Sequence, residues 1–239
     1  MHGPVCAPKS LTWDIWKDLG MERPNILGQR NEVSTNGAIS LFFQGEDLRQ
    51  QGELKKALAC YLAAERIARA SALHDTVVDC LNRRIDLHLK LGEHQQAQRA
   101  SIEGLTYVRL IERNGDELLF LRLLGRTHRE LGHFSTAIEV IFEGLELARE
   151  QRKVSLELDL VADLAEVSLS SEDYEGARRH ATAGMNRAIL VKDCARARNF
   201  AHIIDETKTR LHCEKEAESL LSKAIGLLPP LRLPFSNKI

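Results

Sequence analysis

Apolar residues along the chain recur at the three- and four-residue spacing of an α-helix, and not at the every-other-residue spacing of a strand. Polar and charged residues fill the positions between them, so each segment has one apolar face. Small and turn-forming residues interrupt the pattern regularly and divide it into paired helices of about 15 and about 20 residues. The clearest apolar runs are Leu81, Ile85 and Leu89, and Leu118, Leu121 and Leu124.

The interruptions belong to an internal repeat with a period of 40 residues. One alanine marks each repeat, and a second small residue follows it after seven positions. A fixed period of this length is typical of proteins built from repeated helix-turn-helix units. The alanines are Ala57, Ala97, Ala137, Ala177 and Ala217, and the later small residues are Ala64, Gly104, Gly144, Gly184 and Ala224.

The later small residues indicate a seam where helices approach closely. Glycine inside a helix costs about 0.5–1 kcal/mol relative to alanine, so its repeated use needs a compensating contact. Only Ala or Gly lets two helix axes come close together. We therefore expect Gly104, Gly144 and Gly184 to face a neighbouring helix.

Two sets of turn residues predict where the helices end and begin. Gly92 and Gly132 each follow a leucine and are expected to end the first helix of a pair in a left-handed turn. Polar residues between the repeats are expected to cap the next helix by accepting its free amides. These predicted N-caps are His74-Asp75, Asn114-Gly115-Asp116, Val154-Ser155 and Lys192-Asp193.

The segments Leu123–Gly125 and Leu131–Ala137, followed by Ile141 and Gly144, resemble a tetratricopeptide repeat. That family places small residues at the eighth, twentieth and twenty-seventh positions of each unit. The resemblance implies an all-α, right-handed α-solenoid of five tetratricopeptide-like repeats over residues 35–228. The repeats would span about 35–74, 75–114, 115–153, 154–192 and 193–228.

The 40-residue period is longer than the usual 34 of this family. It resembles the extended variant found in adaptors of the Leu-Gly-Asn-repeat kind, in peptide-sensing bacterial regulators, and in sensory arrays fused to bacterial signalling enzymes. No effector domain is recognised after residue 228. We therefore expect an adaptor or scaffold in signalling or complex assembly, with a regulatory peptide- or ligand-sensing module as the alternative.

The resemblance also implies that the first helices of the repeats line a concave groove for a partner peptide or helix. The groove positions carried over from the family form three columns along the repeats. The first column is Phe42, Asn82, Arg122, Ala162 and His202; the second is Glu46, Asp86, Arg126, Glu166 and Glu206; the third is Arg49, Leu89, Arg129, Leu169 and Thr209.

The middle repeat carries three arginines on one helix face, because Arg122, Arg126 and Arg129 have i, i+4, i+7 spacing. Arginine suits fork-like recognition of a carboxylate or phosphate, so the triad is a candidate anchor for a partner. The alternative is that the arginines pair with Asp86 and Glu166 and only solvate the groove.

Chaperone-tail binding is not expected, because the family's carboxylate-clamp class uses Lys and Asn where this chain has Phe42 and Glu46. The mixed charges instead favour an amphipathic helix. An RNA-binding helical-repeat protein is the less favoured class, since its basic stripes continue across many repeats. Here the basic cluster belongs to one repeat and is flanked by Asp79 and Asp159.

Both ends of the chain are expected to have roles of their own. Residues 1–34 contain Trp13 and Trp16 in a short amphipathic segment, which either caps the first hairpin or docks into the groove or onto a partner. Pro229-Pro230 ends the last helix before the tail at 229–239. The apolar residues before it, Leu220 and Leu221 among them, are expected to be covered either by this tail or by a second subunit, in a homodimer through the C-terminal repeat.

Composition narrows the function further. The formal net charge of −1 gives no general attraction to nucleic acid or to a membrane surface. The five cysteines are scattered without a CxxC pair, so neither a disulfide framework nor a zinc site is expected. No leader, membrane span, nucleotide-binding or hydrolase motif is found. The sequence thus predicts a cytoplasmic, non-enzymatic protein without metal or cofactor.

Overall fold

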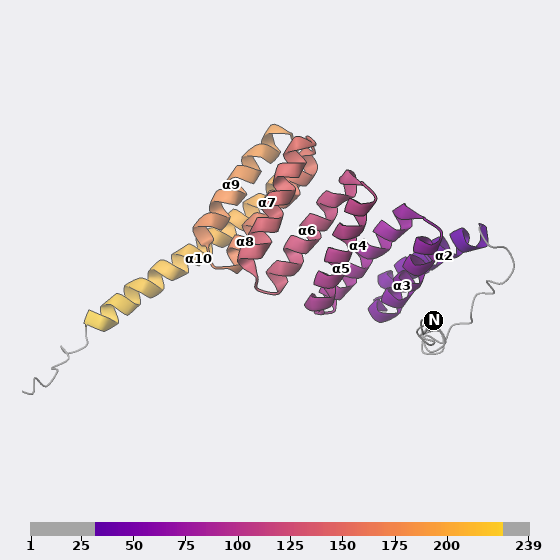
Figure 1. Cartoon of the computed structure of the whole chain (residues 1–239). Coiled ribbons are helices and arrows are strands. Elements are labelled where there is room, and N and C mark those ends of the chain that lie inside the picture. Colours follow the sequence, from indigo (N-terminus) through magenta and orange to yellow (C-terminus); the bar gives the residue numbers. More distant parts are fainter. Residues whose placement is uncertain (1–31, 227–239) are drawn as a thin grey trace, which may run out of the picture. The chain divides into compact units, whose positions relative to one another are not determined.

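The computed structural model describes residues 32–226, and the side chains of 36–213 and 215–216. Every regular element within 32–226 is an α-helix, which confirms the all-α prediction (Figure 1). The first helices of the repeats are α2 (Glu32–Gln50), α4 (His74–Lys90), α6 (Asn114–Glu130), α8 (Val154–Ser170) and α10 (Cys194–Gly226). The second helices are α3 (Leu54–Ala70), α5 (His94–Leu110), α7 (Phe134–Glu150) and α9 (Tyr174–Leu190).

The turns between helices place one residue in the left-handed region every 20 positions. Gly92 and Gly132 have φ values of 72° and 74°, which confirms their predicted role at the end of a first helix. Glycine is not required at every turn, because five residues with side chains adopt the same region. The left-handed residues are Gly52, Ala72, Gly92, Glu112, Gly132, Arg152, Glu172 and Lys192.

The predicted N-caps are correct at one turn and wrong at three. Asp193 accepts a hydrogen bond from the Arg196 amide at 3.0 Å, as a cap of α10 should. The residues before α4, α6 and α8 are instead Leu73, Arg113 and Lys153, without a side-chain cap. The tight backbone turn starts each of these helices one or two residues earlier than its acidic or hydroxyl residue.

The described residues fall into two compact units, divided between Leu131 and Gly132. In unit 1, α2 packs on α3, α3 on α4, α4 on α5 and α5 on α6. Its core contains Leu41, Ala64 and Cys80 in one cluster, and Tyr61 with Leu87 in another. Consecutive helices are therefore neighbours in space, as expected of stacked helical hairpins.

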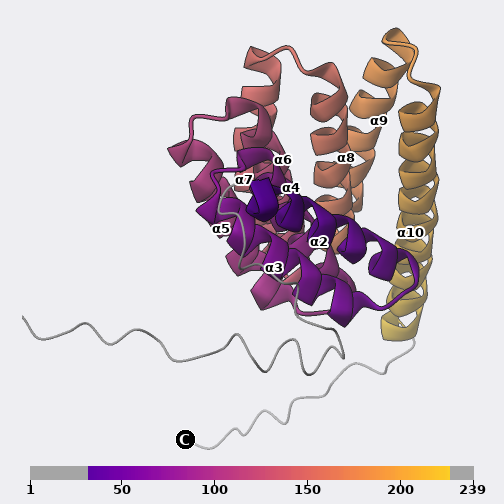
Figure 2. The same ribbon diagram turned by 90° about the vertical axis from the view of Figure 1, so that its right-hand side faces the viewer.

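In unit 2, α7 packs on α8, α8 on α9 and α9 on α10. Helices α9 and α10 lie side by side in both views (Figures 1 and 2). The core joins Leu158 and Ala165 of α8, Ala181 of α9 and Phe200 of α10. The predicted seam is present here, because a Cβ atom on Gly184 would overlap the Phe200 ring.

The fifth hairpin predicted for residues 193–228 does not form. The turn expected near His212 is absent, and α10 continues as one helix of 33 residues past the end of α9 (Figure 1). Two positions that other first helices bury are charged in α10, so a second helix would gain less by packing there. Arg198 replaces the buried Val78, Leu118 and Leu158, and Asp205 replaces the buried Ile85, Gly125 and Ala165.

The second helices do not depend on a side-chain cap. Asp173 caps α9 by accepting a hydrogen bond from the Gly176 amide at 2.9 Å, but α3, α5 and α7 begin without such a bond. The residue at the corresponding position of the last repeat, Cys213, therefore does not explain why the fifth hairpin is absent.

Several predictions fall outside the described residues. Trp13, Trp16 and the tail at 229–239 are among them, and so are the side chains of Leu220 and Leu221. The role of the N-terminal segment and the homodimer through the C-terminal repeat therefore remain predictions.

Candidate functional site

The first helices of unit 1 bring nine of the predicted groove residues together. Helices α2, α4 and α6 are neighbours, with α4 in the middle. All nine side chains are half-buried, as expected of residues that line a shared face. We call this set the first-helix face of unit 1: Phe42, Glu46, Arg49, Asn82, Asp86, Leu89, Arg122, Arg126 and Arg129.

The α2 part of this face is held by a carboxylate with three partners. Glu46 accepts hydrogen bonds from Arg49 at 2.7 Å and from the Tyr61 hydroxyl at 2.6 Å, and Arg83 forms an ion pair with it at 2.7 Å. Burial raises the pKa of Glu46, but the bonds from Arg49 and Tyr61 and the charge of Arg83 outweigh this, so the pKa is lowered. Arg49 therefore has a structural partner.

Phe42 is likewise engaged within the protein. Its ring lies 5.5 Å from that of Tyr61 and 5.8 Å edge-on to that of Phe43, centroid to centroid. Phe42 also packs against both core clusters of unit 1. Phe43, by contrast, is 61% exposed. The structure gives Phe42 and Arg49 a packing role, and their contact with a partner remains a prediction.

The arginines of α6 are not equivalent. Arg129 donates to Glu130 at 2.8 Å, and Arg122 also has an interaction within the protein. Asp86, one of the expected partners of the triad, pairs with Lys90 of its own helix at 2.7 Å. Arg126 has no hydrogen bond or ion pair within the described part of the chain, although its side chain is half-buried. Asn82 lies beside this region on α4.

The remaining predicted groove residues belong to unit 2. Glu166 lies half-buried on α8 and has an interaction within the protein, while His202 is exposed on α10. Helices α8 and α10 are neighbours in this unit. The two residues therefore occupy a first-helix face of unit 2, as the column pattern predicts.

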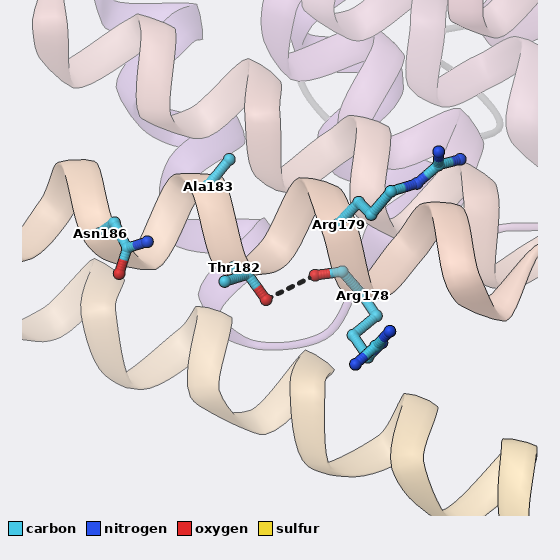
Figure 3. Close-up of a pocket in the computed structure, with 5 residues that line it drawn as sticks. All are labelled: Arg178, Arg179, Thr182, Ala183 and Asn186. Atoms are coloured by element: carbon cyan, nitrogen blue, oxygen red, sulfur yellow. Dashed lines mark hydrogen bonds between the residues drawn. The ribbon is translucent and has the colours of Figure 1, made fainter.

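Sequence analysis missed a pair of cavities on α9 and α10. The larger, of about 420 Å³, is bordered by α9 residues; in Figure 3 Arg178 extends toward α10 and Arg179 away from it. The second, of about 310 Å³, lies between α9 and α10 and shares Arg178. The sequence feature that could have indicated these cavities is the pair of adjacent arginines, Arg178 and Arg179. The linings are Arg178, Arg179, Thr182, Ala183 and Asn186, and Glu175, Arg178, Lys208, Leu211, His212 and Lys215.

A buried charge cluster in unit 1 was missed as well. Glu65 is only 5% exposed and pairs with Arg69 of its own helix and Arg84 of α4. Arg69 also reaches Glu103 of α5 at 2.8 Å and lies over the Tyr107 ring. Because it joins three consecutive helices, the cluster fixes how α3, α4 and α5 pack.

None of the described helices is both long and apolar enough to cross a membrane. No group of three or more His, Cys, Asp or Glu side chains is placed to hold a metal ion in this part of the chain.

Comparison with known proteins gives matches to structures only. No protein-family model matches the sequence, and no curated protein matches it. A signal transduction ATPase with a tetratricopeptide repeat sensor, from Pyrococcus horikoshii, matches with a TM-score of 0.65 and 16% identity over 83% of this chain. A Rap protein complexed with Competence and Sporulation Factor matches with a TM-score of 0.64 and 12% identity, also over 83%.

A putative kinesin light chain with tetratricopeptide-like repeats, from Podosopora anserina, has a TM-score of 0.63 and 14% identity over 82% of this chain and 95% of its own. The chain spans only 32% of the ATPase and 55% of the Rap protein. At identities of 12–16% these matches support the fold alone.

Proposed function

We propose that this chain, an all-α solenoid with the fold of tetratricopeptide-repeat proteins, is a non-catalytic module that binds another protein. A peptide or helix of the partner would lie on the first-helix face of unit 1. The observation that carries the proposal is Arg126, a half-buried residue whose guanidinium has no hydrogen bond or ion pair within the described part of the chain. A scaffold or adaptor in signalling or complex assembly is the role that this site supports best.

The chemistry of Arg126 favours a carboxylate from the partner. A guanidinium that is not engaged within the described part of the chain can bind an approaching carboxylate through paired, charge-assisted hydrogen bonds. Such bonds contribute about 1.5–3 kcal/mol. The guanidinium fork also fixes the direction of approach.

The surroundings of Arg126 favour a partner with charges of both signs. Asp86 precedes it by one repeat in the same column, and Lys90 holds Asp86 through a partly exposed ion pair of 2.7 Å. A partner cation can take over such a pair at little cost, because exposed ion pairs contribute only about 0.2–1 kcal/mol. An amphipathic helix with an acidic and a basic residue on one face meets both requirements.

A sensing role is the second candidate. It is supported by two of the matched structures, one of a protein with a tetratricopeptide repeat sensor and one of a protein complexed with a factor. In a sensor, a short free peptide alone would bind and change the shape of the array. In an adaptor, a short free peptide would not be enough. We place the protein in the cytoplasm, in agreement with the four described cysteines, all of which are free thiols.

The experiment compares Arg126→Glu with Arg66→Glu, an exposed arginine on α3 of the same unit. Proteins that cross-link to the intact chain in native lysate are quantified for both variants. We expect a partner that survives Arg66→Glu and is lost with Arg126→Glu. Titration of that purified partner should then show at least about a tenfold weaker Kd.

Helical circular dichroism must agree for all three proteins, so that a lost partner reflects the side chain and not the fold. Equal retention of every partner by both variants would contradict the proposal.

A further inference from the structure

The two cavities of unit 2 share Arg178; the larger is bordered by α9 residues and the smaller lies between α9 and α10, and we call them together the basic cleft. Four side chains in its lining are permanent cations: Arg178, Arg179, Lys208 and Lys215. Glu175 is the single carboxylate among the lining residues of both cavities. The cleft therefore carries a positive charge on a chain whose net charge is −1.

The ion pairs around the cleft are local and weak. Arg178 pairs with Glu175 at 2.7 Å, Lys208 with Asp205 at 3.2 Å, and each pair joins residues three positions apart. The side chains of these pairs are 49–77% exposed. Pairs of this kind contribute about 0.3–0.5 kcal/mol, so a ligand carboxylate can replace them.

Two cations of the cleft have no such pair. No ion pair of Arg179 or Lys215 is found with the side chains that the structure describes. Arg179 lines the cavity on α9 and extends away from α10, while Lys215 lines the cavity between α9 and α10 (Figure 3). The cleft thus offers both helices to an anionic ligand.

The cleft is open because α10 does not turn back. In a fifth hairpin, α10 would end near Cys213 and a separate helix would follow. Lys215 would then belong to that separate helix, whereas it now lies on α10. The unbroken helix instead carries Leu211, His212 and Lys215 past the first turn of α9. The loss of the fifth hairpin therefore creates this surface.

We infer that the basic cleft is a second interaction surface and that it takes an acidic, extended segment of a partner protein. From Glu175 to Asn186 the α9 wall covers about 16 Å at 1.5 Å per residue. An extended chain of about five residues covers the same length at 3.3 Å per residue. Carboxylates on such a segment meet cations on both walls, while Leu211 and Ala183 offer apolar contact between them.

The cleft fits a peptide better than a nucleic acid. Glu175, Asp205 and Glu216 alternate with the cations along both helices. A phosphate at every position of a strand would meet these carboxylates and be repelled. A peptide can place its acidic residues only where a cation faces it.

The test uses a fluorescein-labelled peptide of about eight residues, mostly glutamate and glycine, and follows its fluorescence anisotropy with the full chain at low salt. The variant is Arg179→Glu/Lys215→Glu. The control is Lys55→Glu/Arg66→Glu, which changes the net charge equally on exposed positions of α3. Circular dichroism checks that both remain helical, and labelled oligothymidylate of similar length is titrated in parallel.

We expect the variant to weaken peptide binding at least about tenfold and the control to change it less than about twofold. Arg126→Glu should leave it unchanged, which separates this surface from the first-helix face of unit 1. Equal loss in the variant and the control, or no loss in either, would overturn the inference. Oligothymidylate binding as tight as the peptide's, with the same loss, would overturn it in favour of a nucleic-acid site.

Discussion

The ring of Phe120 occupies the space that a Cβ atom on Gly104 would need. Gly184 and Phe200 have the same relationship one unit further along the chain. In the first repeat the small residue is Ala64 and its neighbour is Cys80, a much smaller side chain. The size of one residue therefore complements the size of the residue 16 positions later.

Gly104→Ala should destabilise the protein. Alanine improves helix propensity by about 1 kcal/mol, but its methyl group overlaps a fully buried ring, and overpacking costs about 1–3 kcal/mol. We expect a net loss of about 1 kcal/mol in urea unfolding. Gly37→Ala is the control, because nothing lies within 4 Å of its added Cβ atom. It should stabilise by about 0.5–1 kcal/mol, and equal behaviour of the two variants would refute the packing argument.

The double variant Gly104→Ala/Phe120→Cys reproduces the pair found at Ala64 and Cys80. Phe120→Cys alone opens a cavity and should cost about 3 kcal/mol or more. In the double variant the added methyl group has room, so the two costs should not add. A double-mutant cycle should give a coupling of at least about 1 kcal/mol, whereas strict additivity would show that the two side chains do not compete for space.

The fold could be predicted from the sequence because the repeat fixes both the turns and the seam. Gly92, Gly132, Gly104 and Gly184 behave as their positions predict. The capping prediction was wrong at three turns because backbone bonds close them without a side chain. The fifth hairpin was predicted from the fifth copy of the repeat, at His212–Ala217 and Ala224, although Arg198 and Asp205 place charges where other first helices are buried.

The candidate site was harder to predict. Column positions assign Arg126 to the first-helix face of unit 1, and its contact with a partner remains a prediction. They did not indicate which groups already have partners, because Arg49 binds Glu46 three residues away and Tyr61 reaches it from the next helix. Such pairings depend on side-chain geometry that a periodic pattern does not contain.

The Glu46→Gln variant should lose less of its free energy of unfolding than the unmodified protein as the pH falls into the acid range. The pKa of Glu46 is lowered in the folded protein, so the native state favours the charged carboxylate. Its contribution is fully present above the ordinary glutamate pKa of 4.5 and is lost as the pH falls through the lower folded value. The variant should be less stable by about 1–3 kcal/mol at neutral pH, and the difference should shrink toward about pH 3. A difference that stays constant with pH would show that the carboxylate charge does not contribute.

Thiol reactivity should separate the cysteines into two classes. Burial raises the pKa of Cys60 and, together with the charges of Glu65 and Asp79, raises the pKa of Cys80 to about 12. Both thiols are therefore neutral and inaccessible near pH 8. In a Cys6→Ser chain treated with a chromogenic disulfide reagent, Cys194 and Cys213 should react at once, and the other two only after unfolding. Fast reaction of all four would contradict the burial of Cys60 and Cys80.

The continuity of α10 can be measured as a distance. Spin labels at His202→Cys and Ser222→Cys, in a chain whose native cysteines are replaced by serine, are separated by 20 residues of the same helix. An unbroken helix places their backbones about 30 Å apart, at 1.5 Å per residue. A hairpin turning near His212 would instead put the labelled positions side by side, about 10 Å apart. Pulsed electron resonance distinguishes the two.

A short distance would show that the fifth repeat forms. It would also contradict the basic cleft, because Lys215 would then no longer lie on the same helix as Lys208. A long distance would confirm that the array ends in one continuous helix.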